Sequence, residues 1–164
     1  MRRPRKPDAQ AAEADEKTVR TAALALLAGR DFGRAELARR LERRGYPVDK
    51  VAAVVQALTA ERLLSEERFL EQFIRQRAGR GHGPVRIRME LRERGIADAD
   101  IEEALEAAEQ DWAAAAREAR RRRFGVSPPG DYPARARQAR FLQYRGFSAD
   151  QIRAALGPGD DSEP

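Results

Sequence analysis

The chain contains no cysteine and only one histidine, His82, among its 164 residues. Without cysteine there are no disulfides, no thiolate nucleophile and no cysteine-ligated zinc. A single histidine cannot supply a metal site with two histidine ligands or a relay between two histidines. We therefore predict no catalytic residue, no metal site and no cofactor, and hence a protein that is not an enzyme.

Long apolar runs are absent and aromatic residues are scarce. No run of about 18 apolar residues exists that could span a bilayer, and residues 1–17 lack the apolar core of a signal peptide. We expect a cytoplasmic protein with no membrane partner. Aromatic residues make up 6% of the chain and charged residues 36%. That composition suits either helices with solvated faces or a partly disordered chain, and the apolar periodicity favours helices.

The chain does contain a motif that occurs three times. Its copies are LERRGY at 41–46, LRERGI at 91–96 and LQYRGF at 142–147. Each has an apolar residue four before a glycine, an arginine directly before it and an apolar or aromatic residue directly after it. The glycines are 50 and then 51 residues apart, so the chain holds about three units. A unit of about 50 residues is only marginally stable alone, so we expect the units to pack on one another.

This period predicts an all-α fold made of three tandem three-helix repeats of about 50 residues, which form an elongated, curved molecule. Apolar residues in each unit recur at helical spacing. The predicted boundaries are a disordered basic N-terminal tail at 1–17, three-helix repeats at 18–64, 65–110 and 111–156, and an acidic C-terminal tail at 157–164.

Local signals place several helix ends. Ser65 is a good N-cap, Pro84 suits the first position of a helix, and Asp98 is expected to cap the helix that follows it. Residues 148–151, SADQ, fit a capping box. Residues 85–91 alternate between apolar and polar as a strand would, but the corresponding positions of the first unit show no alternation, so we predict a helix.

Charge is distributed by helix. The net charge is +5, from 32 basic and 27 acidic side chains, and nearly all the basic ones are arginine. Arginine-rich segments occur at 34–44, 85–94, 113–123 and 134–145, whereas 98–111 holds seven acidic residues and no basic one. Because this segregation recurs with the repeat, it favours an extended anionic partner.

The outward arginines form the candidate binding surface. If Ile87 and Leu91 face inward, Arg92 points away from the core and Arg86 and Arg88 flank it. Within the motif at 91–96, Arg92 and Arg94 are expected to be free to bind. The alternative is that these arginines pair with neighbouring carboxylates, where each exposed pair contributes at most about 1 kcal/mol. The candidate residues are Arg39, Arg43, Arg86, Arg88, Arg92, Arg120, Arg121, Arg137 and Arg140.

The loop at 79–83, GRGHG, resembles a phosphate cradle in front of a helix N-terminus. It follows a predicted helix rather than a strand and lacks the Lys-Ser/Thr ending of a P-loop. We therefore interpret it as a flexible joint between helices, and we interpret the glycine- and proline-rich segment at 125–131 in the same way.

Several segments together resemble the bacterial RecX family, the regulators of the RecA recombinase. They are LTAERLLSEERF at 58–69, Arg77, the glycine-rich loop, and ELRERGI at 90–96. The resemblance covers about residues 22–156. The chain departs from the family pattern at Arg62, where a glycine is common, at Ser65, where an aspartate is common, and at Leu70, where an alanine is common.

The resemblance implies a fold of tandem three-helix repeats and a regulatory role in DNA repair, homologous recombination and the SOS response. Family members bind RecA filaments on single-stranded DNA and lie in the filament groove. They inhibit ATP hydrolysis, strand exchange and co-protease activity by blocking filament extension or promoting disassembly. For this chain the resemblance implies the RecA filament as partner, single-stranded DNA as a further partner, and a monomeric state.

Two other functions remain open from the sequence. An arginine-rich helix in a three-helix unit also resembles a helix-turn-helix module, so the chain could be a stand-alone DNA-binding regulator. It could also be a purely structural adaptor. If the arginine surface binds filaments, replacing Arg86, Arg88 and Arg92 with glutamate should weaken binding while leaving the helices intact.

Overall fold

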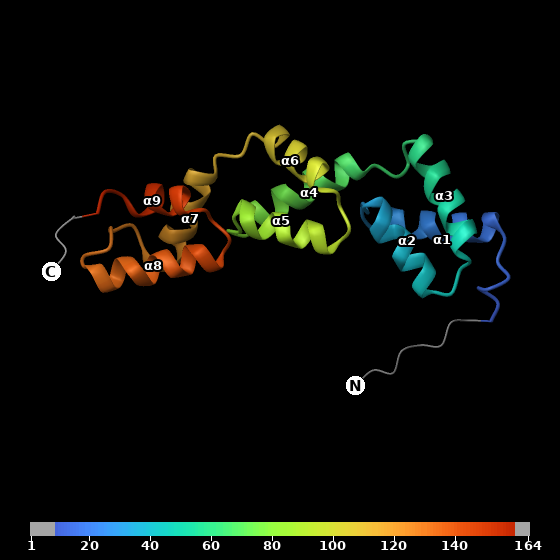
Figure 1. The fold of residues 1–164 in the computed structure, drawn as a ribbon, viewed down its shortest axis with the longest axis horizontal. Helices are drawn as coiled ribbons and strands as arrows, with labels where there is room; N and C mark the ends of the chain where they lie inside the picture. Colours follow the sequence, from blue (N-terminus) through green and yellow to red (C-terminus); the bar gives the residue numbers. More distant parts are fainter. Residues whose placement is uncertain (1–8, 160–164) are drawn as a thin grey trace. The chain divides into compact units, whose positions relative to one another are not determined.

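Nine helices make up the regular structure of residues 9–159, the part of the chain that the computed structural model describes (Figure 1). The predicted all-α fold is confirmed, and the alternating segment 85–91 lies in a helix. The helices are α1 (Glu16–Gly29), α2 (Arg34–Arg43), α3 (Val48–Ala60), α4 (Glu66–Gly79), α5 (Pro84–Glu93), α6 (Asp98–Ala107), α7 (Trp112–Phe124), α8 (Tyr132–Tyr144) and α9 (Ala149–Leu156).

Each copy of the motif ends the second helix of a repeat. We refer to α1–α3, α4–α6 and α7–α9 as the first, second and third repeats. The motif leucines, Leu41, Leu91 and Leu142, are each fully buried. The motif glycines then leave the helix in the left-handed region, with φ values of 95° at Gly45, 82° at Gly95 and 92° at Gly146. Glycine adopts that conformation without a steric penalty, so the motif is a helix stop attached to a core residue.

The chain divides by its internal contacts into two compact units. The first comprises Met1–Leu70 with Arg94–Ile96, and the second comprises Glu71–Glu93 with Ala97–Pro164. In the first unit α1, α2 and α3 pack around an apolar core that includes Val19, Leu37 and Leu58. In the second unit α7 packs against both α8 and α9, around a core that includes Ala116, Leu142 and Phe147.

The predicted helix ends are largely confirmed. The Ser65 hydroxyl accepts a hydrogen bond from the Arg68 amide at 3.2 Å, Pro84 is the first residue of α5, and Ser148 begins a complete capping box. The prediction for Asp98 is wrong: Ala97 is the N-cap of α6, and Asp98 is the first residue of the helix. Its carboxylate is instead bound by Arg92 at 2.6 Å.

The predicted N-terminal tail is too long. Residues 1–8 lie outside the described part of the chain, as do residues 160–164 of the predicted acidic tail. The Asp15 carboxylate caps α1 by accepting from the Thr18 amide, and Ala11 and Ala14 are buried. Ala14 belongs to the apolar core of the first unit. The sequence predicted disorder for residues 9–17, because alanine is a weak apolar signal.

The loop at 79–83 is a packed junction, not the flexible joint that we predicted. The Gly83 amide donates to the carbonyl of Arg145 at 2.8 Å, and the Val85 amide donates to the carbonyl of Gly146 at 2.9 Å. Gly83 is buried, and a Cβ at this position would collide with the backbone of Gly146 and Phe147. Because its amide is already bonded, Gly83 is not available to cradle a phosphate.

Candidate partner-binding surface

The second helices of the repeats carry arginines on their outer faces, as predicted. In α5 the buried pair Ile87 and Leu91 defines the inner face, so the side chains of Arg86, Arg88 and Arg92 project away from the core. These three side chains are 33%, 34% and 56% exposed. The geometry therefore confirms which way the arginines point but leaves open whether they are available.

Carboxylates of the same repeat bind the α5 arginines. Arg88 forms a two-point contact with Glu102 of α6, at 2.6 and 3.1 Å. Arg92 donates to Asp98 at 2.6 Å. The acidic character of α6 thus neutralises the basic face of α5, and hydrogen bonding from Arg88 lowers the pKa of Glu102 below its usual value. The alternative of local carboxylate pairing, left open by the sequence, holds for these residues.

Arg94 is also engaged, so the prediction that Arg92 and Arg94 are free is wrong for both. Arg94 donates to Glu36 of α2 at 3.0 Å, and Glu36 accepts a further hydrogen bond from Arg30 at 2.6 Å. The guanidinium of Arg39 lies against Gly95, where a Cβ would collide with it. Arg43, in the last turn of α2, is exposed.

A partly buried network surrounds the single histidine. Glu90 accepts from Arg77 at 2.7 Å and from Arg86 at 3.1 Å. Burial raises the pKa of Glu90, but the hydrogen bonds from the two arginines outweigh it and hold that pKa below its usual value. Burial, followed by the charge of Arg86, lowers the pKa of His82, which favours the neutral imidazole. The residues of this network stabilise α4 against α5 and offer no reactive pair.

The prediction for Arg120 is wrong, because this residue is 8% exposed and belongs to the interior of the third repeat. Its guanidinium donates to the Gln138 side chain at 3.1 Å and to the carbonyls of Ser127 and Val126 at 3.1 and 3.4 Å. Ala116, one helical turn before Arg120, is fully buried, so both residues lie on the inner face of α7. A buried guanidinium needs such acceptors to offset the loss of water.

Arg121 lies on the exposed side of α7, but it too has a carboxylate partner. Glu118 accepts from Arg121 at 2.8 and 2.9 Å and from Arg122 at 2.9 Å. These hydrogen bonds lower the pKa of Glu118 to about 2. The carboxylate therefore stays charged at physiological pH and holds both arginines along the helix.

Arg137 and Arg140 are exposed, as predicted, and they lie together. They line a concave surface between the C-terminal end of α7 and α8, which we call the α7/α8 groove. Its lining residues are Arg123, Phe124, Arg137, Arg140, Phe141 and Tyr144. Sequence reasoning missed the aromatic residues of this groove. The signal was present, because positions 137, 140, 141 and 144 fall on one helical face.

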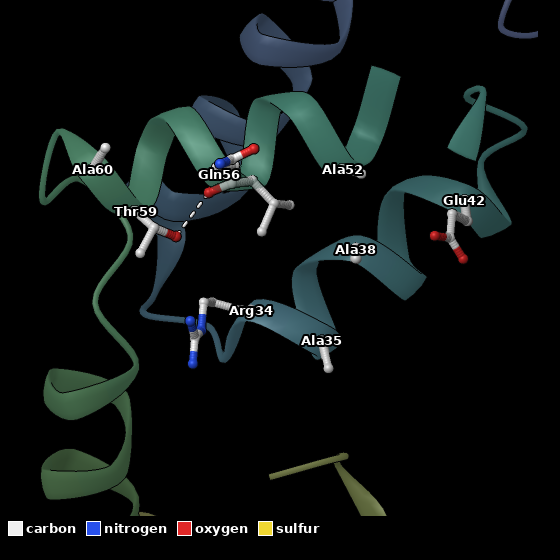
Figure 2. Close-up of a pocket in the computed structure, with 9 residues that line it drawn as sticks. Arg34, Ala35, Ala38, Glu42, Ala52, Gln56, Thr59 and Ala60 are labelled. Atoms are coloured by element: carbon white, nitrogen blue, oxygen red, sulfur yellow. Dashed lines mark hydrogen bonds between the residues drawn. The ribbon is translucent and has the colours of Figure 1, made fainter. Parts of the chain in front are cut away.

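A second concave surface lies between α2 and α3 (Figure 2). Small side chains line it, among them Ala35 and Ala38 from α2 and Ala52 from α3, with Arg34 and Glu42 also in the lining. Within α3, the Thr59 hydroxyl donates a hydrogen bond to the Val55 carbonyl at 2.7 Å. The hydroxyl proton is thus already bonded inside the helix and does not need an acceptor from a bound molecule. Apart from the alanines, no sequence pattern indicated this groove.

Residues 9–159 were searched for helices that could span a membrane and for clusters of metal-ligating side chains. No helix there has the length and apolar character needed to cross a bilayer. No group of three or more histidine, aspartate or glutamate side chains there could hold a metal ion.

Comparison with known proteins covers nearly the whole chain. Family models described as the first, second and third three-helix domains of RecX match residues 20–58, 65–105 and 102–156. The regulatory protein RecX of Halorhodospira halophila is 53% identical over 93% of this chain and 94% of its own length. The regulatory protein RecX of Pseudomonas savastanoi pv. phaseolicola is 48% identical over 87% of this chain and 93% of its own length.

Solved structures share the fold. The crystal structure of RecX from Lactobacillus salivarius superposes with a TM-score of 0.69 at 22% identity, covering 87% of this chain and 94% of that one. A second crystal structure, of a regulatory protein RecX, gives a TM-score of 0.65 at 20% identity over 85% of this chain and 72% of that one. With the three domain models and the high identity to curated relatives, these matches place the chain in the RecX family of regulatory proteins.

Proposed function

We propose that this protein binds RecA nucleoprotein filaments and inhibits their recombinase, ATPase and co-protease activities, by blocking filament extension or promoting disassembly. The observation that carries the proposal is the match to regulatory proteins named RecX along nearly the entire chain, one of them 53% identical. The protein acts in the cytoplasm, in recombinational repair and the SOS response. It works by binding rather than by catalysis.

The arginines of the second helices supply the contact surface in this proposal. Arg43, Arg137 and Arg140 are exposed on α2 and α8. Arg86, Arg88 and Arg92 have carboxylate partners, but the pairs of Arg88 and Arg92 are solvent-exposed. Such pairs contribute at most about 1 kcal/mol, so an anionic partner can replace the carboxylate at little cost. Arg120, by contrast, takes no part because it is buried.

Because Arg86, Arg88 and Arg92 of α5 form ion pairs, replacing them with glutamate is not the best test of this surface. Reversing Arg86, Arg88 and Arg92 to glutamate would place like charges beside Glu90, Glu102 and Asp98, which destabilises the second repeat itself. Glutamine at the three positions keeps a polar side chain there and avoids that repulsion. We expect this variant to keep its helix content and to bind filaments roughly tenfold or more weakly, because it cannot form charge-assisted hydrogen bonds to the partner.

The experiment is a titration of the full-length chain into RecA that is hydrolysing ATP on single-stranded DNA. The expected result is loss of ATPase activity at well below one chain per recombinase monomer, with a rightward shift for the glutamine variant. Circular dichroism of the variant provides the control for folding. Unchanged ATPase at equimolar chain, together with sequence-specific binding to duplex DNA, would instead support a stand-alone helix-turn-helix regulator.

A further inference from the structure

The concave surface between α2 and α3, which we call the α2/α3 groove, is an apolar opening in the surface of the first repeat. All of its lining residues belong to the first compact unit. Because the Thr59 hydroxyl is bonded inside α3, it does not hold water in the groove. An apolar surface of this kind gains free energy when another apolar surface covers it. The apolar residues of the lining are Ala35, Ala38, Ala52, Val55 and Ala60.

The second repeat has an ion pair at the corresponding place. The motif glycines of the two repeats are 50 residues apart, so Ala38 of α2 corresponds to Arg88 of α5. By the same offset, Ala52 of α3 corresponds to Glu102 of α6. Arg88 binds Glu102 at two points, at 2.6 and 3.1 Å, and so joins α5 to α6. Two alanines cannot form such a bridge. The α2/α3 groove is therefore open because of the residues at these two positions, and the three-helix fold itself does not require it.

Opposite charges stand at the two ends of the groove (Figure 2). Arg34 is the first residue of α2 and Glu42 is the last but one, which places them about 12 Å apart along the helix axis. The Arg34 guanidinium contacts Glu66 at 3.2 Å, but its side chain is 53% exposed. Glu42 is exposed, and none of the ion pairs of residues 9–159 involves it. Each end can thus accept a group of opposite charge from a partner.

We propose that the α2/α3 groove binds an amphipathic α-helix of a protein partner. Two apolar side chains of that helix, four residues apart, lie against the alanines, with an acidic side chain beside Arg34 and a basic one beside Glu42. Side chains four apart on a helix are separated by about 6 Å along the axis, so two of them fit between the charged ends. A nucleic acid would meet the carboxylate of Glu42, and a small apolar ligand would leave both charges unused. This contact requires no recombinase and goes beyond the function proposed above.

The probe is a synthetic alanine-rich peptide of about 20 residues, long enough to form a helix in water. It carries two leucines four residues apart, with an aspartate three residues before the first and a lysine three residues after the second. Added to the isotope-labelled full-length chain without recombinase, it should shift the amide resonances of residues 34–60 and leave those of 111–156 unchanged. A peptide of the same composition with its leucines on opposite faces should bind at least roughly tenfold more weakly, because only one leucine is then buried. No shift in 34–60 at millimolar peptide would overturn the proposal.

The double variant Ala38→Arg with Ala52→Glu gives the first repeat the ion pair of the second. The new side chains cover the alanines, so the peptide should bind at least roughly tenfold more weakly. Helix content and thermal unfolding should stay close to those of the wild type, because an exposed ion pair contributes little to stability. Ala25→Arg with Ala57→Glu is the matched control: it adds the same side chains at exposed alanines that do not line the groove, and should bind within about twofold of the wild type. Equal losses from the two double variants would overturn the proposal.

A double-mutant cycle tests the charge at the Glu42 end. Glu42→Gln should weaken binding of the peptide roughly 1.5- to 5-fold, the range for an exposed ion pair, and so should replacing the peptide lysine with glutamine. The two changes together should cost no more than either alone, because both remove the same contact. Losses that multiply would show that the lysine does not meet Glu42, and would overturn the proposed arrangement.

Sedimentation equilibrium without peptide tests a second copy of the chain as the occupant. The wild type and the variant Ala38→Arg with Ala52→Glu should give the same mass at every concentration. If the wild type self-associates and this variant does not, the groove is a contact between copies of the chain and the proposal fails. Because no recombinase is present in any of these experiments, that failure would leave the proposed regulatory function untouched.

Discussion

The first and third repeats use the same helical frame with different interiors. The residue eight before the motif glycine is Leu37 in the first repeat, fully buried, and Gln138 in the third, 5% exposed. Gln138 is paired with Arg120, which in turn binds the segment after α7. The first repeat is thus held by apolar packing, whereas the third contains a buried polar pair between α7 and α8. The three-helix arrangement is therefore retained even though one repeat has a buried polar pair in its core.

The largest effect should come from removing Arg120. Arg120→Ala leaves the Gln138 side chain and the carbonyls of Ser127 and Val126 without their donor, which should lower the free energy of unfolding by about 2–4 kcal/mol. Urea unfolding followed by fluorescence of Trp112, the only tryptophan and part of the third repeat, measures this change. Arg121→Ala, on the exposed side of α7, is the control and should cost less than about 1 kcal/mol.

The double variant Arg120→Leu with Gln138→Leu sharpens the same comparison. It gives the third repeat an apolar pair in the manner of the first. It should recover part of the stability that Arg120→Ala removes, because Gln138 no longer lacks a partner, although the carbonyls of Ser127 and Val126 still do. A double variant as unstable as Arg120→Ala would show that the polar pair is not interchangeable with an apolar one.

Substitutions in the loops that precede α2 and α5 should change the free energy of unfolding by less, and by different amounts in the two loops. A Cβ on Gly83 would collide with the backbone of Gly146, which cannot move without breaking two hydrogen bonds. Gly83→Ala should therefore cost about 1–3 kcal/mol, the usual range for overpacking. A Cβ on Gly33 would come within 3.1 Å of the end of the Ile96 side chain, which can rotate.

Gly33→Ala should accordingly change the free energy of unfolding by less than about 1 kcal/mol in either direction. The measurement is urea unfolding of both variants, followed by circular dichroism and, for Gly83→Ala, by Trp112 fluorescence as well. Our explanation predicts a larger loss of stability at Gly83, where a Cβ meets backbone, than at Gly33, where it meets a side chain. Equal losses in the free energy of unfolding for the two variants would contradict it.

The smallest effect concerns the left-handed residue just beyond the third helix of a repeat. After α9 it is Gly157, with φ 75°, whereas after α3 it is Arg62, with φ 58°. A left-handed conformation costs a residue with a Cβ about 1–2 kcal/mol, part of which glycine gives back through its greater freedom in the unfolded chain. Arg62→Gly should thus stabilise the first repeat by up to about 1 kcal/mol in thermal unfolding. Destabilisation would mean that the Arg62 side chain makes a compensating interaction.

Arg62 is also where sequence reasoning was most informative about local structure. The resemblance to the family marked this position as one where glycine is common, and the positive φ supplies the physical reason. The motif likewise predicted the core leucines and the helix-ending glycines, because both follow from local periodicity and backbone sterics. These features depend on residues within one or two helical turns of each other.

The sequence did not predict contacts between residues that lie far apart along the chain. Arg120 occurs in a run of arginines and looks like a surface residue, and only the positions of Gln138 and the 126–127 carbonyls account for its burial. The partners of Arg88 and Arg94 lie 14 and 58 residues away along the chain. Charge segregation indicated that basic and acidic helices exist, but not that α6 neutralises α5. Of the arginines predicted to form the binding surface, Arg137 and Arg140 lie together in one groove. The sequence of α8 could have indicated this groove, because its basic and aromatic residues fall on one face of the helix.

The most direct test of the proposed regulatory role is to image single RecA filaments growing on single-stranded DNA, with and without the full-length chain. At one chain for many recombinase monomers, we expect filaments to stop lengthening or to shorten, and the choice between these outcomes distinguishes capping from disassembly. Filaments that grow at the same rate and to the same length with the chain in excess would contradict the account.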